Sequence, residues 1–313
     1  MGALPSERTE LTRPFAHTGT DIAGPFDIKN YTGPACLITK GYVCVFVCFS
    51  TKAIHLEPTS DLSTTTFMSA FQRFISRRGC PLHIHSDNGT NFIGASKQLA
   101  REFLHNSKVA IENKYSHQNI QWHFIPPGAP HMGGLWEAGV KSFKSHIRKL
   151  AGPFKYTFEE FSTLLSQIEA CLNSRPLSPQ SQDPSDLSAL TPGHFLTGGP
   201  ILAPLESVPT ESPISVTNRW QRLKVIHKDF CVRWKNEYLR ELQKRTKWKT
   251  PYPDFQIDDL VIVKEDNLPP NTWRLGRVIQ LHNGPDNRVR VVDIRTQKGT
   301  IRRPIAKLIR LPN

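Results

Sequence analysis

Two acidic residues stand where the local sequence suits a metal-binding carboxylate. Asp21 lies in an extended-looking segment that we expect Gly24-Pro25 to stop, so its side chain would project near a strand end. Asp87 follows the alternating segment 82–86, which predicts a short strand, and precedes an Asn-Gly pair, which predicts a sharp turn. Carboxylate oxygens are the ligands that Mg²⁺ prefers. The pattern indicates a site for chemistry on phosphates.

A third acidic residue, Glu137, opens a segment with helical spacing. Its apolar residues recur as one stripe that we expect to be buried: Trp136, Val140, Phe143 and Ile147. The adjoining face carries Glu137 together with Lys141, Lys144 and Arg148. A carboxylate beside three cations suits a metal ligand next to a phosphate-binding track. The plain alternative is an exposed helix with an ion pair between residues four apart.

Taken singly these signals are weak, because an Asp before Asn-Gly is usually a turn residue. Their order and surroundings resemble the integrases of LTR retroelements, most closely those of the BEL/Pao retrotransposons of animals. The stretches that carry the resemblance follow one another along nearly the whole chain: 20–26, 51–57, 86–92, 126–137, 190–196, 233–239, 266–270 and 275–278.

The resemblance implies a D,D,E-type DNA strand transferase whose catalytic residues and metal ligands are Asp21, Asp87 and Glu137. Two Mg²⁺ or Mn²⁺ ions are implied, with Asp21 bridging both. The reaction would process the 3′ ends of the element's DNA and join them to target DNA. The 49 residues between Asp87 and Glu137 exceed the usual retroviral spacing. We expect the extra length, around 103–120, to form a helix and loop before a strand at 121–125.

The resemblance also implies partners and a missing part. DNA is the expected partner, and the active form is expected to be a homo-oligomer in the nucleus, with some protein in the cytoplasm. Retroelement integrases carry a zinc module ahead of the core, whereas only 20 residues precede Asp21 here. We therefore expect no zinc in this chain, and a fragment or a shortened gene product.

The positive charge is concentrated near the C-terminus. The chain has a formal net charge of +13, and residues 217–313 hold 22 Lys and Arg against 10 Asp and Glu, while residues 1–216 hold 18 against 17. A basic region joined to a near-neutral one favours a polyanionic partner, because cations placed on phosphates release counterions. The alternative is a basic surface that serves solubility alone. The DNA-binding residues that we expect are Asn91, His131, Lys141, Lys144, Arg148, Arg277, Arg290, Arg302 and Arg303.

The sequence predicts an α/β protein with two folded parts. The core is expected to be an RNase H-like mixed five-stranded sheet flanked by helices, with one helix from Ser63 to Gly79 and another begun by a capping box at Thr157. A basic helix and a small β-barrel follow. We place the parts as an N-terminal tail at 1–14, the core at 15–176, a Pro- and Ser-rich extended connector at 177–216, and a basic domain at 217–313 with its helix at 218–249 and its barrel at 254–312.

Composition excludes several other classes of protein. With 38% hydrophobic residues in 313, disorder throughout is not expected, and no run approaches the roughly 20 apolar residues of a membrane span. No apolar signal-peptide region opens the chain, so secretion is not expected. The six cysteines form no Cys-x-x-Cys pair, which argues against a disulfide framework. We expect no membrane partner and no small-molecule cofactor.

Two other functions stay open from the sequence. The chain could be a catalytically silent DNA-binding protein derived from an integrase, although the presence of all three carboxylates argues mildly against that. An RNase H-type nuclease would use similar carboxylates but needs a fourth, and no convincing candidate stands near the other three.

Overall fold

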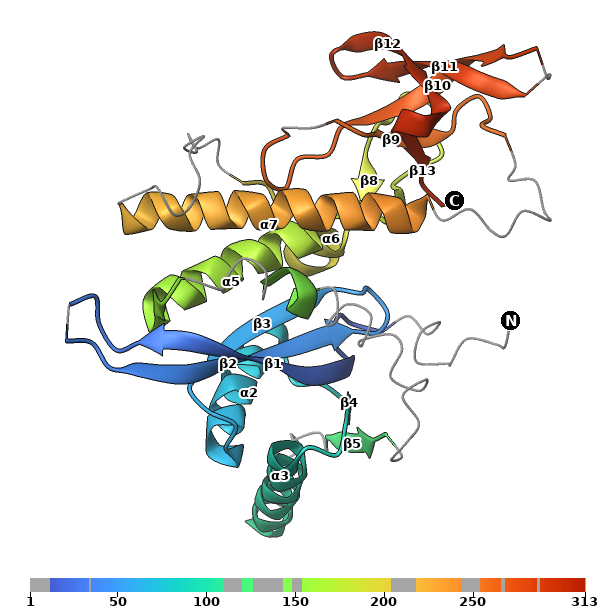
Figure 1. Cartoon of the computed structure of the whole chain (residues 1–313). Coiled ribbons are helices and arrows are strands. Elements are labelled where there is room, and N and C mark those ends of the chain that lie inside the picture. Colours follow the sequence, from blue (N-terminus) through green and yellow to red (C-terminus); the bar gives the residue numbers. More distant parts are fainter. Residues whose placement is uncertain are drawn as a thin grey trace. The chain divides into compact units, whose positions relative to one another are not determined.

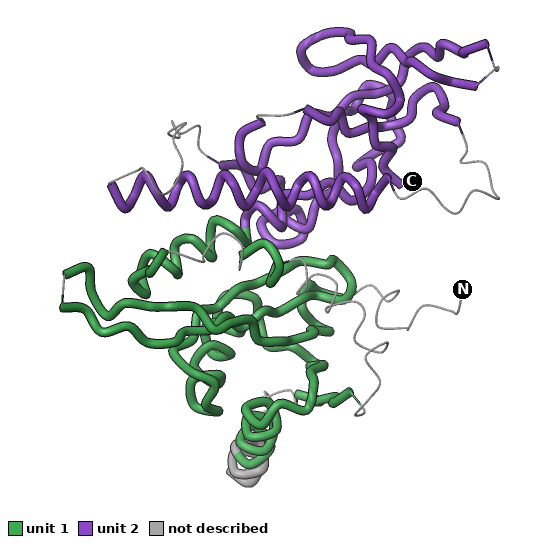
Figure 2. Tube along the Cα trace, in the orientation of Figure 1, with its two compact units in different colours: residues 1–169 green, residues 170–313 purple. Residues whose placement is uncertain are grey.

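The computed structural model divides the chain into two compact units, Met1–Glu169 and Ala170–Asn313 (Figure 2). The structure describes residues 12–33, 35–109, 120–125, 143–147, 154–203, 218–243, 254–265, 268–285 and 288–312, with the backbone alone for 102–109. The boundary falls inside helix α5 (Phe158–Asn173), earlier than the connector in which the sequence led us to expect it.

Unit 1 is built on a mixed sheet with the strand order β3-β2-β1-β4-β5 (Figure 1). The strands are β1 (His17–Lys29), β2 (Ile38–Cys48), β3 (Ile54–Thr59), β4 (His83–Ser86) and β5 (Gln121–Phe124). The first three pair antiparallel, while β4 runs parallel to β1 and β5 parallel to β4. A short strand, β6 (Tyr156–Thr157), adds to β1. This order and these directions are those of the RNase H-like fold, as predicted.

Helices α2 (Thr64–Arg78) and α5 lie on opposite faces of the sheet (Figure 1). The α2 face is filled by aromatic rings, with Phe46 of β2 against Phe67, Phe71 and Phe74. On the other face Phe26 of β1 meets Phe161 of α5, with ring centroids 5.2 Å apart. Helix α3 (Thr90–Val109) follows β4, and residues 143–147 are helical. The central strand β2 is thus buried from both sides, and its inner residues read as a continuous apolar run.

The predicted helix caps of unit 1 are present. Ser63 accepts a hydrogen bond from the Thr66 amide, and Gly79 closes α2 with a bond from its amide to the Ile75 carbonyl. At α5 the Glu160 amide donates to Thr157 Oγ1, and the Thr157 amide donates to the Glu160 carboxylate, which is a complete capping box.

Strand β1 continues past Gly24-Pro25, so the prediction that this pair stops it is wrong. The pairing with β2 shifts register between Ala23 and Phe26, and the strand then runs on to Lys29. Proline is tolerated at such a shift because a bulge leaves one residue out of the hydrogen-bonded ladder. A side chain at Gly24 would meet the Tyr42 ring at 2.5 Å, so only glycine fits there. Asp21 therefore lies inside a long strand.

Unit 2 joins a long helix to a five-stranded antiparallel sheet. Helix α7 (Arg219–Leu242) begins at the predicted residue, with Asn218 accepting from the amides of Trp220 and Gln221. It ends at Leu242, before the predicted end at 249; residues 244–253 lie outside the described part. The sheet has the order β12-β11-β10-β9-β13. Its strands are β9 (Leu260–Val263), β10 (Leu275–Asn283), β11 (Val289–Thr296), β12 (Gly299–Pro304) and β13 (Leu308–Arg310), with a 3-10 turn η3 (Ile305–Lys307) before the last.

The sheet of unit 2 buries apolar residues on both faces at β9. Val261 and Val263 join a core with Val278, Val292, Ile294 and Leu308. Leu260 and Ile262 point the other way and contact Leu239 of α7 and Ile309. The long helix thus covers one face of the strand pair β9 and β13.

The stretch after α5 is more ordered than the predicted extended connector. It contains a two-strand ladder, β7 (Ser178–Pro179) with β8 (Ala189–Leu190), and a short helix α6 (Pro192–Thr197). Tyr238 of α7 donates a hydrogen bond to the Pro176 carbonyl at 2.5 Å, and Trp273 Nε1 donates to Ser174 Oγ at 3.2 Å. These bonds join segments far apart in the chain, which local sequence patterns do not report.

All six cysteines are free thiols, with Cys44 and Cys48 buried in β2, so the prediction of no disulfide framework is confirmed. Among the helices that the structure describes, none is long and apolar enough to cross a membrane.

Candidate active site

Asp21 and Asp87 occupy matching positions on two neighbouring parallel strands. In the pairing of β1 with β4, His17 lies beside His83 and Gly19 beside His85. Asp21 lies two residues after Gly19, and Asp87 lies two residues after His85, so the two acidic residues follow the same register. Because side chains two residues apart point to the same face of a sheet, Asp21 lies on the same face of β1 as His17, and Asp87 follows one residue past the end of β4, next to it in this register. Two acidic groups predicted from separate motifs are thus brought to the same end of the parallel strand pair.

The loop that carries Asp87 is fixed by hydrogen bonds to β5. Trp122 Nε1 donates to Ser86 Oγ at 2.9 Å, and Asn88 Nδ2 donates to the Ile125 carbonyl at 2.7 Å. The carboxylate of Asp87 accepts from the Gly89 amide at 3.0 Å. Asp87 itself is exposed, and α3 begins three residues later at Thr90. The carboxylate is therefore oriented by its own loop while the residue stays exposed to solvent.

Lys144 forms an ion pair with Asp21. Its Nζ lies 2.8 Å from Asp21 Oδ2, and the two side chains are 28% and 25% exposed. The other oxygen, Oδ1, lies 2.6 Å from the amide nitrogen of Ile22. Phe143 and Ile147, on the same helical segment, are buried as the predicted apolar stripe requires. A cation thus sits on the carboxylate that we expected to bind metal.

Four of the residues predicted for the site lie outside the described part of the chain: Glu137, His131, Lys141 and Arg148. Within the part that is described, no group of three or more His, Cys, Asp or Glu side chains could hold a metal ion. Of the three residues predicted as metal ligands, the structure describes Asp21 and Asp87, and carboxylate oxygens are hard donors of the kind that Mg²⁺ or Mn²⁺ prefers.

Asn91, predicted to contact DNA, is 8% exposed and lies next to Asp87. A Cβ added to Gly89 would come within 2.8 Å of Asn91 Oδ1 and 3.1 Å of Asp87 Oδ1, so these two side-chain oxygens converge over the glycine. Among the described residues, Nδ2 of Asn91 is buried without a hydrogen-bond partner. A buried amide donor of this kind is costly unless a ligand, a water or another part of the chain accepts from it.

A row of histidines lies beside the carboxylates and was not predicted as a group. His17 stacks on His83 with ring centroids 4.4 Å apart, and His123 contacts both His83 and His85. His83 Nδ1 and His123 Nε2 share a hydrogen bond of 3.0 Å. The alternation of 82–86 places His83 and His85 on one face, but His17 and His123 join them only through the parallel register.

A second polar group, the His55 network, ties β3 to α2 and α5. His55 faces two carboxylates, with Nε2 at 2.9 Å from Glu57 and Nδ1 at 3.1 Å from Glu169. Arg73 and Arg77 of α2 bond Glu57 at 2.6 and 3.0 Å, and Arg78 bonds Glu169. The Leu56 amide also donates to Glu169, at 2.9 Å.

The groups of the His55 network titrate away from their ordinary values. Burial disfavours the charged imidazole, but hydrogen bonds to Glu169 and Glu57 outweigh it and raise the pKa of His55. Burial likewise opposes charge on Glu57, yet its bonds to His55 and Arg73 lower its pKa, and His55 and Arg78 lower the pKa of Glu169. The contacts of the network therefore favour the charged form of His55.

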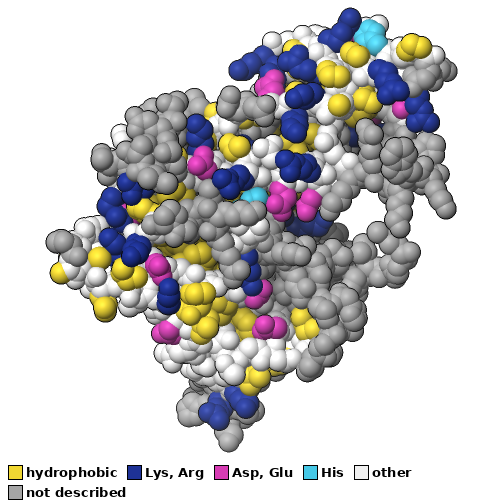
Figure 3. Space-filling view, in the orientation of Figure 1, with side chains coloured by type: hydrophobic (Ala, Val, Ile, Leu, Met, Phe, Trp, Pro, Cys, Tyr) yellow, Lys and Arg dark blue, Asp and Glu magenta, His cyan; other side chains and the backbone are white. Residues whose placement is uncertain are grey.

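The basic residues of the C-terminal sheet differ in their exposure and in whether an acidic side chain already pairs with them. Figure 3 shows Lys and Arg side chains gathered over this sheet on the face drawn. Arg290 and Arg302 are exposed, and Arg303 is half-buried. Arg302 forms a two-bond pair with Asp293 at 2.6 and 2.9 Å, and this pair is the main cause that holds the pKa of Asp293 well below its usual range.

Arg277 has a structural role in place of the predicted phosphate contact. Its side chain is buried, and the residue is 4% exposed. The guanidinium donates to three carbonyls, those of Asp186 at 2.8 Å, Asp258 at 2.8 Å and Ser181 at 3.0 Å. Arg277 was predicted to bind DNA as one of the basic residues of the C-terminal domain, but the loop of the 178–190 ladder covers this position.

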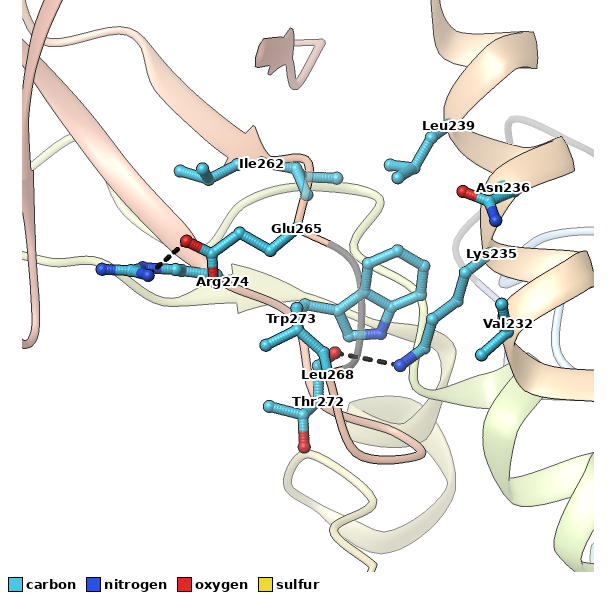
Figure 4. Close-up of a pocket in the computed structure, with 11 residues that line it drawn as sticks. Val232, Lys235, Asn236, Leu239, Ile262, Glu265, Leu268, Thr272, Trp273 and Arg274 are labelled. Atoms are coloured by element: carbon cyan, nitrogen blue, oxygen red, sulfur yellow. Dashed lines mark hydrogen bonds and ion pairs between the residues drawn. The ribbon is translucent and has the colours of Figure 1, made fainter. Parts of the chain in front are cut away.

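Unit 2 also contains a small pocket between α7 and the sheet (Figure 4). Lys235 reaches into it, donates to the carbonyls of Pro269 and Thr272 at 2.9 and 3.1 Å, and holds its ammonium 5.3 Å from the centre of the Trp273 ring. Burial lowers the pKa of Lys235. Because its protons are directed to backbone carbonyls and an aromatic face, Lys235 joins helix to sheet.

Comparison with known proteins gives one family match and several structural matches. Residues 218–311 match a family of unknown function (DUF5641). This span holds α7 and the C-terminal sheet. No curated protein matches the chain.

Among solved structures, the chain is similar to a simian T-cell lymphotropic virus intasome in complex with a PP2A regulatory subunit, at 15% identity and a TM-score of 0.40, over 96% of this chain and 80% of that chain. It is also similar to the HTLV-2 integrase catalytic core domain in complex with magnesium, at 19% identity and a TM-score of 0.36, over 59% of this chain and 97% of that chain. The chain is similar as well to the catalytic core domain of BIV integrase, at 15% identity and a TM-score of 0.38, over 59% of this chain and 95% of that chain.

Proposed function

We propose that this chain is an integrase-type polynucleotidyl transferase of the BEL/Pao retrotransposon class, which joins DNA 3′ ends to target DNA. The observation that carries the proposal is the position of Asp21 on β1 beside the end of the parallel strand β4, which Asp87 directly follows, in an RNase H-like sheet. The motifs around both residues are those on which the sequence resemblance rests.

The residues of the site have distinct roles in this proposal. Asp21 and Asp87, with Glu137, would hold two Mg²⁺ or Mn²⁺ ions, with Asp21 bridging both. When bound, such ions stabilise the charge that develops on the attacking and leaving oxygens of an in-line displacement. The Lys144 ammonium on Asp21 is a stand-in cation and supports the fit of a metal at this oxygen. The loop bonds of Asn88 and Ser86 hold Asp87 in orientation, and no side chain needs to form a covalent intermediate.

DNA binding would be shared between the site and the basic C-terminal unit. Lys144 and Asn91 lie next to the carboxylates, and Arg290, Arg302 and Arg303 are carried by the sheet of unit 2. Contacts of this kind track phosphates without reading base sequence. The active form would be a homo-oligomer that works in the nucleus, where target DNA lies.

The test is metal-dependent strand transfer on a branched DNA substrate, comparing the full chain with Asp87→Asn. We expect joining to fall at least about 100-fold while the dissociation constant for DNA stays within about threefold, because the variant removes a metal ligand and no phosphate contact. Asp27→Asn is the matched control, since Asp27 lies on the same strand β1 and pairs with Lys40 at 2.5 Å, away from the site. Its joining rate should equal that of the unchanged chain.

Two results would oppose the proposal. Equal loss of DNA binding and joining in Asp87→Asn would mean that the residue supports the fold or the DNA contact and not catalysis. Tight DNA binding with no joining by the unchanged chain would favour the silent DNA-binding protein.

A further inference from the structure

The ion pair of Lys144 with Asp21 has a geometry that a bound metal ion would have to break. Nζ lies 2.8 Å from Oδ2, within hydrogen-bonding distance, so the ammonium occupies space that a cation on this oxygen would need. The neighbouring residues Phe143 and Ile147 are 0% and 1% exposed, which holds the backbone of the segment in place. Only the four-carbon side chain of Lys144 is left to move.

The ion pair is suited to exchange. With the two side chains 28% and 25% exposed, water screens the attraction, and pairs of this kind contribute little to stability. A lysine ammonium is a compact point charge on a flexible stem, so it can leave one anion for another. A divalent ion on Asp21 would repel it, and the nearest new anion in a DNA complex is a backbone phosphate.

We propose that Lys144 is an exchangeable counter-ion of the catalytic site. It neutralises Asp21 when no metal is bound and passes to a DNA phosphate when a metal ion takes the carboxylate. Metal binding and DNA binding therefore reinforce each other, and by thermodynamic linkage each raises the affinity for the other by the same factor. This inference rests on the proposed function, because it takes Asp21 as a metal ligand and DNA as the partner.

The experiment measures Mn²⁺ binding from the electron paramagnetic resonance signal of the free ion, with and without branched DNA, on the full chain. Without DNA, Lys144→Met should bind Mn²⁺ about three- to tenfold more tightly than the unchanged chain, because the competing charge is gone. DNA should raise the Mn²⁺ affinity of the unchanged chain by about fivefold or more, and that of Lys144→Met by clearly less.

Three variants serve as controls. Lys144→Arg keeps the positive charge and should bind Mn²⁺ like the unchanged chain in the absence of DNA. Lys40→Met removes a lysine that pairs with Asp27 on the same strand β1 and should change neither affinity. Asp21→Asn should lose Mn²⁺ binding. Circular dichroism checks that each variant is folded, and the arginine variant keeps the test informative should Lys144→Met unfold.

The outcomes separate this inference from the proposed function. If Asp21→Asn loses Mn²⁺ binding but Lys144→Met binds as the unchanged chain does, the counter-ion role of Lys144 is wrong and the metal site stands. If Asp21→Asn binds Mn²⁺ undiminished, the proposed metal site itself is wrong, and the counter-ion role is wrong with it.

Discussion

Gly89 shows how closely single residues are fitted around Asp87. An alanine there would bring its Cβ within 2.8 Å of Asn91 Oδ1 and 3.1 Å of Asp87 Oδ1. Both are the far ends of side chains, which can swing aside at little cost to stability. We expect Gly89→Ala to lower strand transfer by about tenfold or more, because displacements near 1 Å suffice for that. The melting temperature should change little.

The control for this variant is Gly199→Ala, since a Cβ at Gly199 would meet no heavy atom within 4 Å. The measurement compares the DNA-joining rate and the melting temperature of each variant with those of the unchanged chain. A full joining rate in Gly89→Ala would mean that the positions of Asp87 and Asn91 over this glycine do not matter for catalysis.

At the residue scale, the sequence predicted which carboxylates to examine but not what surrounds them. Asp21 and Asp87 were found from their motifs, and the pairing of β1 with β4 brings their positions to the same end of these two strands. The ion pair of Lys144 with Asp21 joins residues 123 positions apart, and no local pattern reports such a pairing. Arg277 was predicted to bind DNA because it is one of several basic residues on the strands of the C-terminal domain, whereas a distant segment covers it.

At the element scale, the His55 network makes the stability of unit 1 depend on pH. The raised pKa of His55 contributes stability that is fully present below 6.5, its ordinary value, and is lost as pH rises through the folded value. The lowered pKa values of Glu57 and Glu169 contribute stability that is present above 4.5 and is lost as pH falls through their folded values. The network therefore stabilises most between these two limits.

We predict that the melting temperature of unit 1 falls by on the order of 3 °C between about pH 6 and pH 9, and that His55→Gln abolishes most of this fall. Scanning calorimetry at several pH values across this range measures the melting temperature of the unchanged chain and of His55→Gln. On the acid side, Glu57→Gln should flatten the loss of stability below pH 4.5. An unchanged pH profile in His55→Gln would show that the imidazole is neutral in the folded chain.

Elements with local signals were predicted best. The caps of α2 and α5 depend on residues three or four positions apart, so the sequence contains the whole motif. The path of β1 past Gly24-Pro25 depends on its pairing with β2, and the loop of the β7 and β8 ladder is bonded to Arg277 of β10, far along the chain. The short strand β13 was missed because three residues are too few for a periodic pattern.

At the scale of the whole molecule, the described arginines of unit 2 include buried ones that stabilise the fold, such as Arg175 and Arg277, and exposed ones, such as Arg290 and Arg302. Arg277→Met should lower the stability of unit 2 by about 2–4 kcal/mol, because three carbonyls lose the hydrogen bonds of a buried donor. Lys298→Met, on an exposed turn, should stay within about 0.5 kcal/mol. Thermal unfolding of the full chain measures the stability of the Arg277→Met and Lys298→Met variants against that of the unchanged chain.

The same division predicts the salt dependence of DNA binding. Arg290→Met should reduce the slope of log affinity against log salt by about one, as expected for one lost phosphate contact. Arg277→Met, measured below its melting temperature, should leave the slope unchanged. A reduced slope in Arg277→Met would return this residue to the DNA-binding surface.

Glu169 has a consequence for how copies of this protein can associate. An edge strand offers its free amides to any passing β-strand, and this is a common route to aggregation. Strand β3 ends its sheet, but the Leu56 amide already donates to the Glu169 carboxylate. A foreign strand that extended the sheet here would have to displace this charge-assisted hydrogen bond. Glu169 thus acts as a gatekeeper that disfavours sheet growth at this edge.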